Sequence, residues 1–252
     1  MAANTDNPTT PHPELNAYYG SESERRSMLG ELFDRSAGSY DAITQWLSLG
    51  TGRWHRSQVL KRAGVTTGFT MLDVACGTGQ VTRVGQALAG ETGKVIGLDA
   101  SLGMLREARS RGCGRLSQGM AETLPFPDRT FDVVTMGYAL RHAADLNTVF
   151  AEYLRVLKPG GQVILMEIAR PDSRLTLGLA RFYMKTLVPR LTGIGTQDPS
   201  AGKLMSYYWD TIEHCVPAPT ITAALDRSGF EAVCIQSWCG GLVKDYFGQR
   251  PA

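Results

Sequence analysis

A glycine-rich run flanked by acids carries the strongest chemical signal in this chain. Gly77 and Gly79 follow an apolar run that ends in Asp73-Val74, and Asp99 stands twenty residues after Gly79, at the end of a second apolar run. Glycines lack the Cβ that would keep the backbone away from a ligand, and an acid at this spacing can accept hydrogen bonds from both hydroxyls of a ribose. The pattern therefore predicts a nucleoside site built on a strand, a glycine turn, a helix and a second strand.

The nucleoside is better matched by S-adenosylmethionine (S-adenosyl-L-methionine) than by a dinucleotide. The dinucleotide fingerprint has a third glycine for close helix packing, and this chain has Thr82 at that place. Asp73 precedes the glycines, and a carboxylate there suits the ammonium group of S-adenosylmethionine better than it suits a pyrophosphate.

The segments around this motif alternate between strand and helix patterns, which is typical of a doubly wound α/β sheet. Strands are predicted at 70–75, 94–99, 115–119, 131–138 and 161–168, with helices at 79–89, 101–111 and 145–157. A helix at 218–228 precedes two more strands, 230–237 and 241–247, which Gly240-Gly241 would join as a hairpin. We therefore expect a sheet that ends antiparallel.

The rest of the chain predicts one domain with additions. Residues 1–22 are polar and contain several prolines, which indicates a flexible N-terminal arm, and residues 23–252 are long enough for a single large domain. Helical spacing with aromatic anchors predicts a helical cap over 23–66. A substrate-side insertion is expected at about 172–216.

Composition excludes several partners. The formal net charge is only +2, with no long run of one sign, so we expect no nucleic acid as a partner. The five cysteines are scattered and contain no C-x-x-C pair, so neither a disulfide framework nor a metal site is expected. The polar N-terminus and the absence of an apolar run of about 20 residues indicate a cytoplasmic protein.

The segment 174–191 has an amphipathic pattern. Leu175, Leu179 and Phe182 favour one side, whereas Arg181 and Lys185 share another. This pattern fits a helix packed on the core or on a second copy of the chain in a homodimer. It also fits peripheral membrane contact or closure over an apolar substrate, and the sequence leaves these alternatives open.

Motif by motif, the chain resembles the ubiquinone/menaquinone biosynthesis C-methyltransferase family, a branch of the class I S-adenosylmethionine-dependent methyltransferases. The matching motifs are Phe33-Asp34-Arg35, Tyr40-Asp41, 73–79, Asp99 with Ser101, Met104 and Leu105, Ala121-Glu122, 124–128, Phe131-Asp132, Leu140-Arg141, 155–161, Glu167, 188–193, Tyr207-Tyr208-Trp209, Pro217 and Gly229-Phe230. The resemblance implies a Rossmann-like doubly wound sheet of seven strands, mostly parallel with an antiparallel C-terminal strand, and a helical cap before it.

The resemblance also implies which residues bind the cofactor. Asp73 would hold its methionine end, Gly77 and Gly79 would let it approach, Asp99 would take the ribose, and Met104 would face the adenine. The other expected cofactor contacts are Tyr40, Ala75, Ala100, Met120 and Ala121.

Methylation of a phenolic ring carbon is helped by a base, because loss of the hydroxyl proton makes the neighbouring carbon nucleophilic. His142, after the predicted strand 131–138, is the candidate, since histidine titrates near neutral pH; a structural histidine fits equally well. Arg141 can stabilise a phenolate or form a structural ion pair. The residues expected to contact the acceptor are Trp54, Tyr138, Phe182 and Tyr208.

Three departures from the family pattern lie near the expected site. Met120 stands where the family usually has Asp or Asn, His142 follows Leu140-Arg141 where Asn is usual, and Val243-Lys244-Asp245 replaces Ala-Leu-His. We expect methyl transfer from S-adenosylmethionine to a ring carbon of a phenolic or quinol small molecule, with or without a prenyl tail. The alternatives are an O-, N- or C-methyltransferase of a specialised metabolite, including heteroaromatic acceptors, and a non-catalytic cofactor-binding scaffold in a biosynthetic complex.

Overall fold

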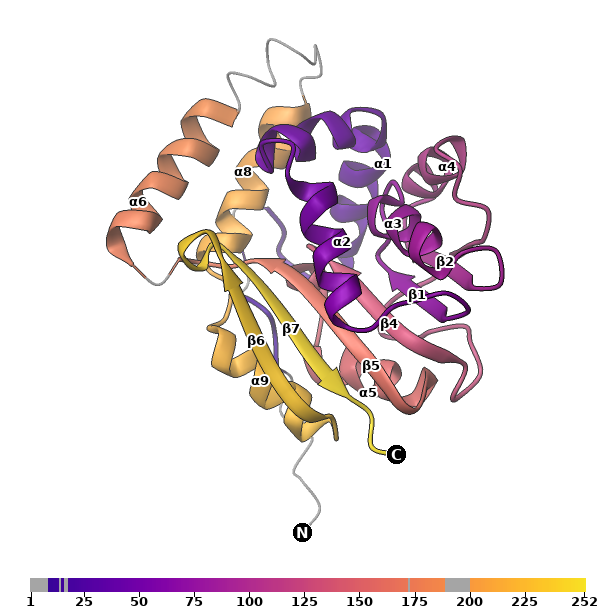
Figure 1. Ribbon diagram of the computed structural model, residues 1–252. Helices are drawn as coiled ribbons and strands as arrows, with labels where there is room; N and C mark the ends of the chain where they lie inside the picture. The colour runs from indigo at the N-terminus through magenta and orange to yellow at the C-terminus, as the bar shows by residue number, and fades with distance from the viewer. Residues whose placement is uncertain (1–8, 14, 16–17, 172, 189–199) are drawn as a thin grey trace.

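The computed structural model describes residues 9–13, 15, 18–171, 173–188 and 200–252. In this part of the chain, seven strands form one sheet in the order β3-β2-β1-β4-β5-β7-β6 (Figure 1). The strands are β1 Thr70–Val74, β2 Lys94–Asp99, β3 Leu116–Gln118, β4 Phe131–Gly137, β5 Leu157–Ile168, β6 Glu231–Trp238 and β7 Val243–Gln249. Strands β1 to β5 are parallel, and β7 is antiparallel to both of its neighbours. The predicted fold class is confirmed.

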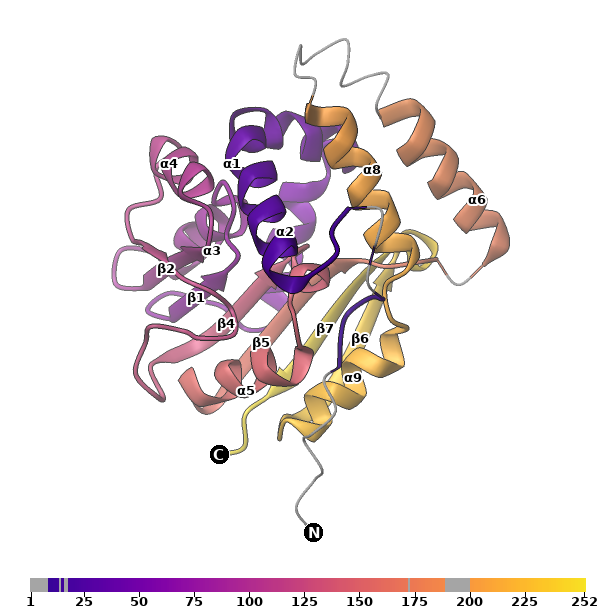
Figure 2. The same cartoon turned by 180° about the vertical axis from the view of Figure 1, so that it is seen from behind.

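Helices cover both faces of this sheet because its central strands are apolar on both sides. Val133 and Ile164 belong to the core under α2 Gly52–Arg62 and α3 Gln80–Ala89, whereas their neighbours Val134 and Leu165 belong to the core on the opposite face. That opposite face is covered by α5 Leu146–Val156 and α9 Ala218–Arg227, which Figure 2 shows from behind. Continuous apolar runs of this kind are expected for buried parallel strands.

The strand predicted at 161–168 begins earlier in the structure and includes residues 158–161. These residues lie inside β5, which begins at Leu157, and the pairing of β5 with β4 shifts register between Phe131 and Val133. The strand therefore accommodates the Pro-Gly-Gly sequence as an irregularity at the end of the sheet where β4 begins.

The N-terminal cap consists of α1 Glu22–Leu47 and α2, and two acids of α1 attach it to the motif loops. Asp34 accepts hydrogen bonds from the Ser101 hydroxyl and from the amide of Gly103, the latter at 2.9 Å, at the start of α4 Leu102–Ser110. Asp41 accepts a hydrogen bond from the Gln80 side chain at 2.7 Å, at the start of α3. The cap is thereby held over the carboxyl ends of the first strands.

The insertion folds into α6 Arg174–Phe182, a π-helical turn at Tyr183–Leu187, and α8 Ser200–Glu213. Buried Tyr207, Trp209 and Ile212 of α8 form a separate small core with Leu32 of α1 and Met184 of the π-helical turn. The predicted helix at 174–191 is confirmed as far as residue 187, and the motif at 189–193 lies outside the described residues.

The described part of the predicted arm is packed against the domain. Thr9 pairs with the start of α5, since its amide donates to Asp145 at 2.7 Å and its carbonyl accepts from Leu146 at 3.0 Å. His12 is buried, and the carbonyl of Pro11 accepts a hydrogen bond from Val216. These residues are ordered against α5 and α9 rather than free, and the division of the chain at residue 22 stays a prediction.

Candidate active site

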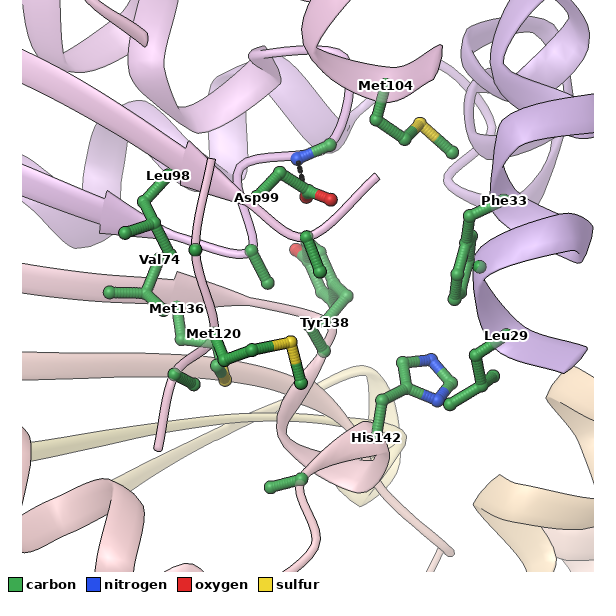
Figure 3. Close-up of a pocket in the computed structure, with 18 of the residues that line it drawn as sticks. Leu29, Phe33, Val74, Leu98, Asp99, Met104, Met120, Met136, Tyr138 and His142 are labelled. Carbon is green, nitrogen blue, oxygen red and sulfur yellow. Dashed lines mark hydrogen bonds between the residues drawn. The ribbon is translucent and has the colours of Figure 1, made fainter. Parts of the chain in front are cut away.

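Two adjoining cavities lie where the carboxyl ends of β1, β2 and β4 meet the helical cap. The Asp99 cavity is lined by Asp99, Met104 and Met120 among others (Figure 3), and the Asp73 cavity is lined by Asp73 and Arg56 among others. Among the described residues, those lining both cavities are Tyr40, Ala75, Gly77, Gly137, Tyr138 and Tyr208. Successive strands are added outward in one direction from β1 to β3 and in the other from β4 onward, so the strand order reverses between β1 and β4, which is where open α/β sheets bind ligands.

The turn after β1 leaves space in the shared wall. Gly77 has φ +54°, and no atom of the described residues lies within 4 Å of the position that its Cβ would take. Its amide donates to Oδ2 of Asp99 at 2.8 Å, and the amide of Ser101 donates to Oδ1 at 2.9 Å (Figure 3 shows the first bond). Burial raises the pKa of Asp99, although these amides oppose the shift. Each carboxylate oxygen keeps a lone pair with which to bind a hydroxyl.

Gly79 has a different reason to be glycine from the one predicted. It lies outside both cavities, at the start of α3 with φ +80°, and a Cβ there would stand 2.3 Å from Sγ of Cys113. The position therefore requires glycine for backbone conformation and for packing against the segment after α4. The cofactor contact of Gly79 stays a prediction.

The Asp73 cavity presents charges of both signs. The Asp73 carboxylate is buried and accepts hydrogen bonds from the Thr82 and Thr135 hydroxyls at 2.6 and 2.9 Å. Burial raises the pKa of Asp73 to about 6, and the hydroxyl hydrogen bonds oppose the shift. Arg56 of α2 is also buried, and its Nε has no hydrogen-bond partner among the described residues. An acid beside an unsatisfied guanidinium is suited to a ligand that carries both an ammonium and a carboxylate group.

Arg56 is a candidate site residue that the sequence did not reveal. It lies in a helix of ordinary surface composition, and no motif distinguishes it from the neighbouring Arg53 or Arg62. The guanidinium lines the cavity only because α2 packs against the sheet.

The remaining expected cofactor contacts gather around the Asp99 cavity. Ala100, Met104, Met120 and Ala121 line it, and Leu98 adds apolar surface at the end of β2. In Figure 3, Leu29 and Phe33 of α1 face Met104 and Met120 across the opening. Tyr40 is placed at the junction, where its hydroxyl lies 2.5 Å from that of Tyr208 and so links α1 to α8.

His142 lines the Asp99 cavity beside Phe33, whose ring it meets edge to face at 5.3 Å between centroids. Burial lowers the pKa of His142 well below its ordinary value, and the positive charge of Arg141 lowers it further. The imidazole is therefore neutral near pH 7 but poorly suited to hold an added proton. Its role as the base stays a prediction.

Arg141 is not among the described residues that line the two cavities. It is buried, its Nη1 lies 3.1 Å from Oε2 of Glu167, and its guanidinium carbon lies 4.5 Å from the ring centre of Tyr208. Glu167 also accepts a hydrogen bond from the amide of Leu140 at 2.6 Å. This geometry favours the structural ion pair over contact with a substrate.

Two of the four expected acceptor contacts are placed at the site and two are not. Tyr138 and Tyr208 line both cavities. Trp54 is 57% exposed and Phe182 is 55% exposed, and both lie outside the two cavities. Trp54 instead meets Trp238 edge to face at 6.0 Å, because its side of α2 turns toward β6. Contact of Trp54 or Phe182 with an acceptor stays a prediction that this placement does not support.

The fold, the glycine loop and the paired acids together define an S-adenosylmethionine-dependent methyltransferase. The model of the ubiE/COQ5 methyltransferase family matches residues 20–250, and the chain belongs to this family. Within the part that the structure describes, no cluster of three or more His, Cys, Asp or Glu residues is placed to hold a metal ion.

Curated relatives agree with this assignment, and solved structures share the fold. The chain is 30% identical to the ubiquinone/menaquinone biosynthesis C-methyltransferase UbiE of Pseudoalteromonas translucida, over 92% of this chain and 95% of that protein. It is 42% identical to the demethylmenaquinone methyltransferase of Symbiobacterium thermophilum, over 67% of this chain and 70% of that protein. The fold is similar to a crystal structure of an S-adenosylmethionine-dependent methyltransferase from Thermotoga maritima, with a TM-score of 0.60, 18% identity, and coverage of 88% of this chain and 99% of that one.

Proposed function

We propose that this methyltransferase acts on a ring carbon of a phenolic or quinol small molecule. The observation that carries the proposal is the Asp73 cavity, whose lining changes along the strand order β1-β4-β5-β7 from charged to apolar. The names of the two relatives, a ubiquinone/menaquinone biosynthesis C-methyltransferase and a demethylmenaquinone methyltransferase, support the same class of acceptor.

The cofactor fits the charged side of the site. Bound S-adenosylmethionine supplies a methyl group on a positively charged sulfur. Asp99 accepts hydrogen bonds from the ribose hydroxyls, and Met104 and Ala121 pack against the adenine. Asp73 and Arg56 hold the ammonium and carboxylate groups of the methionine part. The open space at Gly77 lets the backbone of this turn lie close to the cofactor, between the ribose and the methionine part.

The acceptor fits the apolar side of the Asp73 cavity. Leu47, Ile168, Met184 and Leu242 line this side, and they come from the end of α1, the end of β5, the π-helical turn and the residue before β7. Tyr138 follows β4 and therefore lies between the charged and apolar sides. An apolar pocket that excludes water can align a ring carbon with the methyl group, and such alignment contributes about 7–11 kcal/mol when it is complete.

The exposed apolar residues of α6 leave two further predictions open. Leu175 and Leu179 are 74% and 61% exposed on the outer side of this helix. No helix in the described part of the chain is long and apolar enough to cross a membrane. Contact of α6 with a lipid surface or with a second copy of the chain stays a prediction.

The test is a methyl-transfer assay with labelled cofactor and a panel of demethyl quinols, alkylated phenols and heteroaromatic compounds. We expect the label on a ring carbon of phenols or quinols. Transfer only to oxygen or nitrogen of other acceptors would establish the specialised-metabolite alternative. Tight cofactor binding by calorimetry without transfer to any acceptor would establish the scaffold alternative.

A further inference from the structure

Three polar side chains form a hydrogen-bonded row behind the wall of the Asp73 cavity. Asp245 of β7 is fully buried, and its Oδ2 lies 3.1 Å from Nε2 of His55 in α2. The other ring nitrogen of His55, Nδ1, lies 3.0 Å from the hydroxyl of Tyr138. The row therefore runs from a buried carboxylate, through an imidazole, to a phenol in the cavity wall.

The carboxylate determines which nitrogen of the neutral imidazole carries the proton. A carboxylate only accepts hydrogen bonds, so the contact with Asp245 places the hydrogen of His55 on Nε2. Nδ1 then has a free lone pair and accepts the hydroxyl hydrogen of Tyr138. Because the phenol has one hydrogen, its oxygen has only lone pairs left for a molecule in the cavity.

The position of Tyr138 suits contact with an acceptor. Tyr138 follows β4, lines both cavities, and lies between Asp73 and Ile168 along the strand order. Its backbone has φ +62°, a region that bulky residues rarely adopt, and its amide donates to the carbonyl of Met166 at 2.6 Å. Backbone conformations of this kind are concentrated at functional sites.

We propose that Tyr138, His55 and Asp245 form a proton relay that takes the hydroxyl proton of the acceptor, an inference that rests on the proposed phenolic or quinol acceptor. Tyr138 contacts the acceptor, and His55 and Asp245 are positioning residues that act through it. The acceptor O–H bond breaks and its proton goes to the Tyr138 oxygen, while the proton of Tyr138 goes to Nδ1 of His55. Asp245 then faces an imidazolium. After methylation the ring carbon releases its own hydrogen as a proton to water, and the ring oxygen takes the relayed proton back.

The charges around the row favour this direction of transfer. Oδ2 of Asp245 on β7 lies 3.1 Å from Nε2 of His55, whereas the charges that act on His142 are the cations of Arg141 and Arg25. Burial raises the pKa of Tyr138 to about 12, so its phenol is neutral near pH 7 and must pass its proton on as it receives one. The other charged or titratable groups that face Tyr138 are Arg56 of α2, Glu167 of β5 and Cys239, which precedes β7.

The kinetic test uses Tyr138→Phe and Asp245→Asn, with Trp238→Phe as the matched control. Trp238 donates to the same Asp245 oxygen at 2.6 Å but lies off the proton path. We expect the first two variants to lower kcat by about 10²–10⁴-fold, the usual contribution of general base catalysis, with unchanged cofactor affinity by calorimetry. An acceptor made more acidic by an electron-withdrawing substituent should restore their activity, and Trp238→Phe should keep the wild-type pH profile. Tyr138→Phe with wild-type kcat and pH profile, or an equal loss in Trp238→Phe, would overturn the proposal.

A second readout does not depend on the acceptor. The chain has four histidines, so ¹⁵N NMR of histidine-labelled protein can be assigned with a His55→Gln variant. We expect His55 to carry its hydrogen on Nε2 and to lose this preference in Asp245→Asn. A hydrogen on Nδ1 in the wild-type protein would overturn the relay whichever acceptor is methylated. If the tautomer is as expected but the wild-type enzyme methylates no phenol or quinol, the proposed function fails and the catalytic use of the row fails with it.

Discussion

Oδ2 of Asp99 lies 2.8 Å from the amide nitrogen of Gly77. The acid at the end of β2 therefore holds the turn after β1, and the two halves of the sequence motif are hydrogen-bonded to each other. Because Oδ1 also accepts from Ser101, the same carboxylate positions the start of α4. Asp99 thus shapes the site as well as facing the proposed ribose position.

Replacement of Asp99 by alanine should weaken cofactor binding. The change removes the acceptor for the ribose hydroxyls, and hydrogen bonds to a charged group contribute about 1.5–3 kcal/mol, which corresponds to about 10- to 100-fold in Kd. Calorimetry with S-adenosylmethionine measures the effect. Asp128→Ala is the control, since Asp128 is exposed and precedes the opposite end of β4. Equal affinities of the two variants would argue against the ribose contact.

The two motif glycines should respond differently to alanine. Gly77→Ala adds a methyl group in open space at a positive φ, so we expect a loss of about 1 kcal/mol of unfolding free energy and weaker cofactor binding. Gly79→Ala brings a Cβ to 2.3 Å from Cys113, so we expect a loss of about 2–5 kcal/mol in urea unfolding. Adding Cys113→Ala to Gly79→Ala should restore part of the stability. No recovery in that double variant would contradict the packing role of Gly79.

Asp73 should make both stability and cofactor binding depend on pH. Its folded pKa of about 6 exceeds the unfolded value of about 3.9, so its contribution to stability is fully present below about pH 4 and is lost as pH rises through about 6. Urea unfolding of the free protein should show a fall of about 3 kcal/mol relative to Asp73→Asn over this window. Asp99 and Glu167 have raised pKa values too, so the comparison with the variant isolates Asp73.

Cofactor affinity should change in the opposite direction over the same pH window. The ammonium group of S-adenosylmethionine favours the ionised form of Asp73, so affinity should rise as pH approaches and passes about 6. Calorimetry on Asp73→Asn should show no such rise. A wild-type affinity that is flat between about pH 5 and about pH 7 would contradict the assignment of Asp73 to the methionine part.

The buried pair of Arg141 and Glu167 should matter for stability more than for chemistry. Arg141→Met leaves the Glu167 carboxylate buried without its cation, so we expect a loss of about 3–5 kcal/mol of unfolding free energy. Glu167→Gln in the same chain should recover most of this stability, because the amide oxygen still accepts from Leu140. We expect kcat to recover together with stability. Restored stability with low kcat would instead favour the catalytic role predicted from the sequence.

The elements of the fold and the cofactor motif were predictable because their signals are local. The apolar run of β1, the turn at Gly77 and the amphipathic pattern of α3 follow one another within twenty residues. Each of these signals depends only on the local backbone conformation and on which side chains of the same segment are buried. The hairpin between β6 and β7 was predictable for the same reason, since Gly240 and Gly241 adopt positive φ between the two strands.

Which residues or cavities the aromatic and charged side chains contact was not predictable from such patterns. Trp54 and Phe182 have the residue type expected of an acceptor pocket, but their helices turn them outward. Gly79 has the spacing of a cofactor-binding glycine, but its neighbour in space is Cys113, thirty-four residues away. A residue type predicts what a side chain can do, and packing decides what it faces.

By itself, the sequence determined the α/β sheet, the glycine turn and the acids Asp73 and Asp99, since local periodicity and backbone preference specify these features. Only the tertiary structure placed Arg56 in the cavity and joined His55 to Asp245, which are 190 positions apart. The physical reason is that such contacts form when α2 packs on a sheet whose strand order brings β7 next to β5. No stretch of the chain contains that information alone.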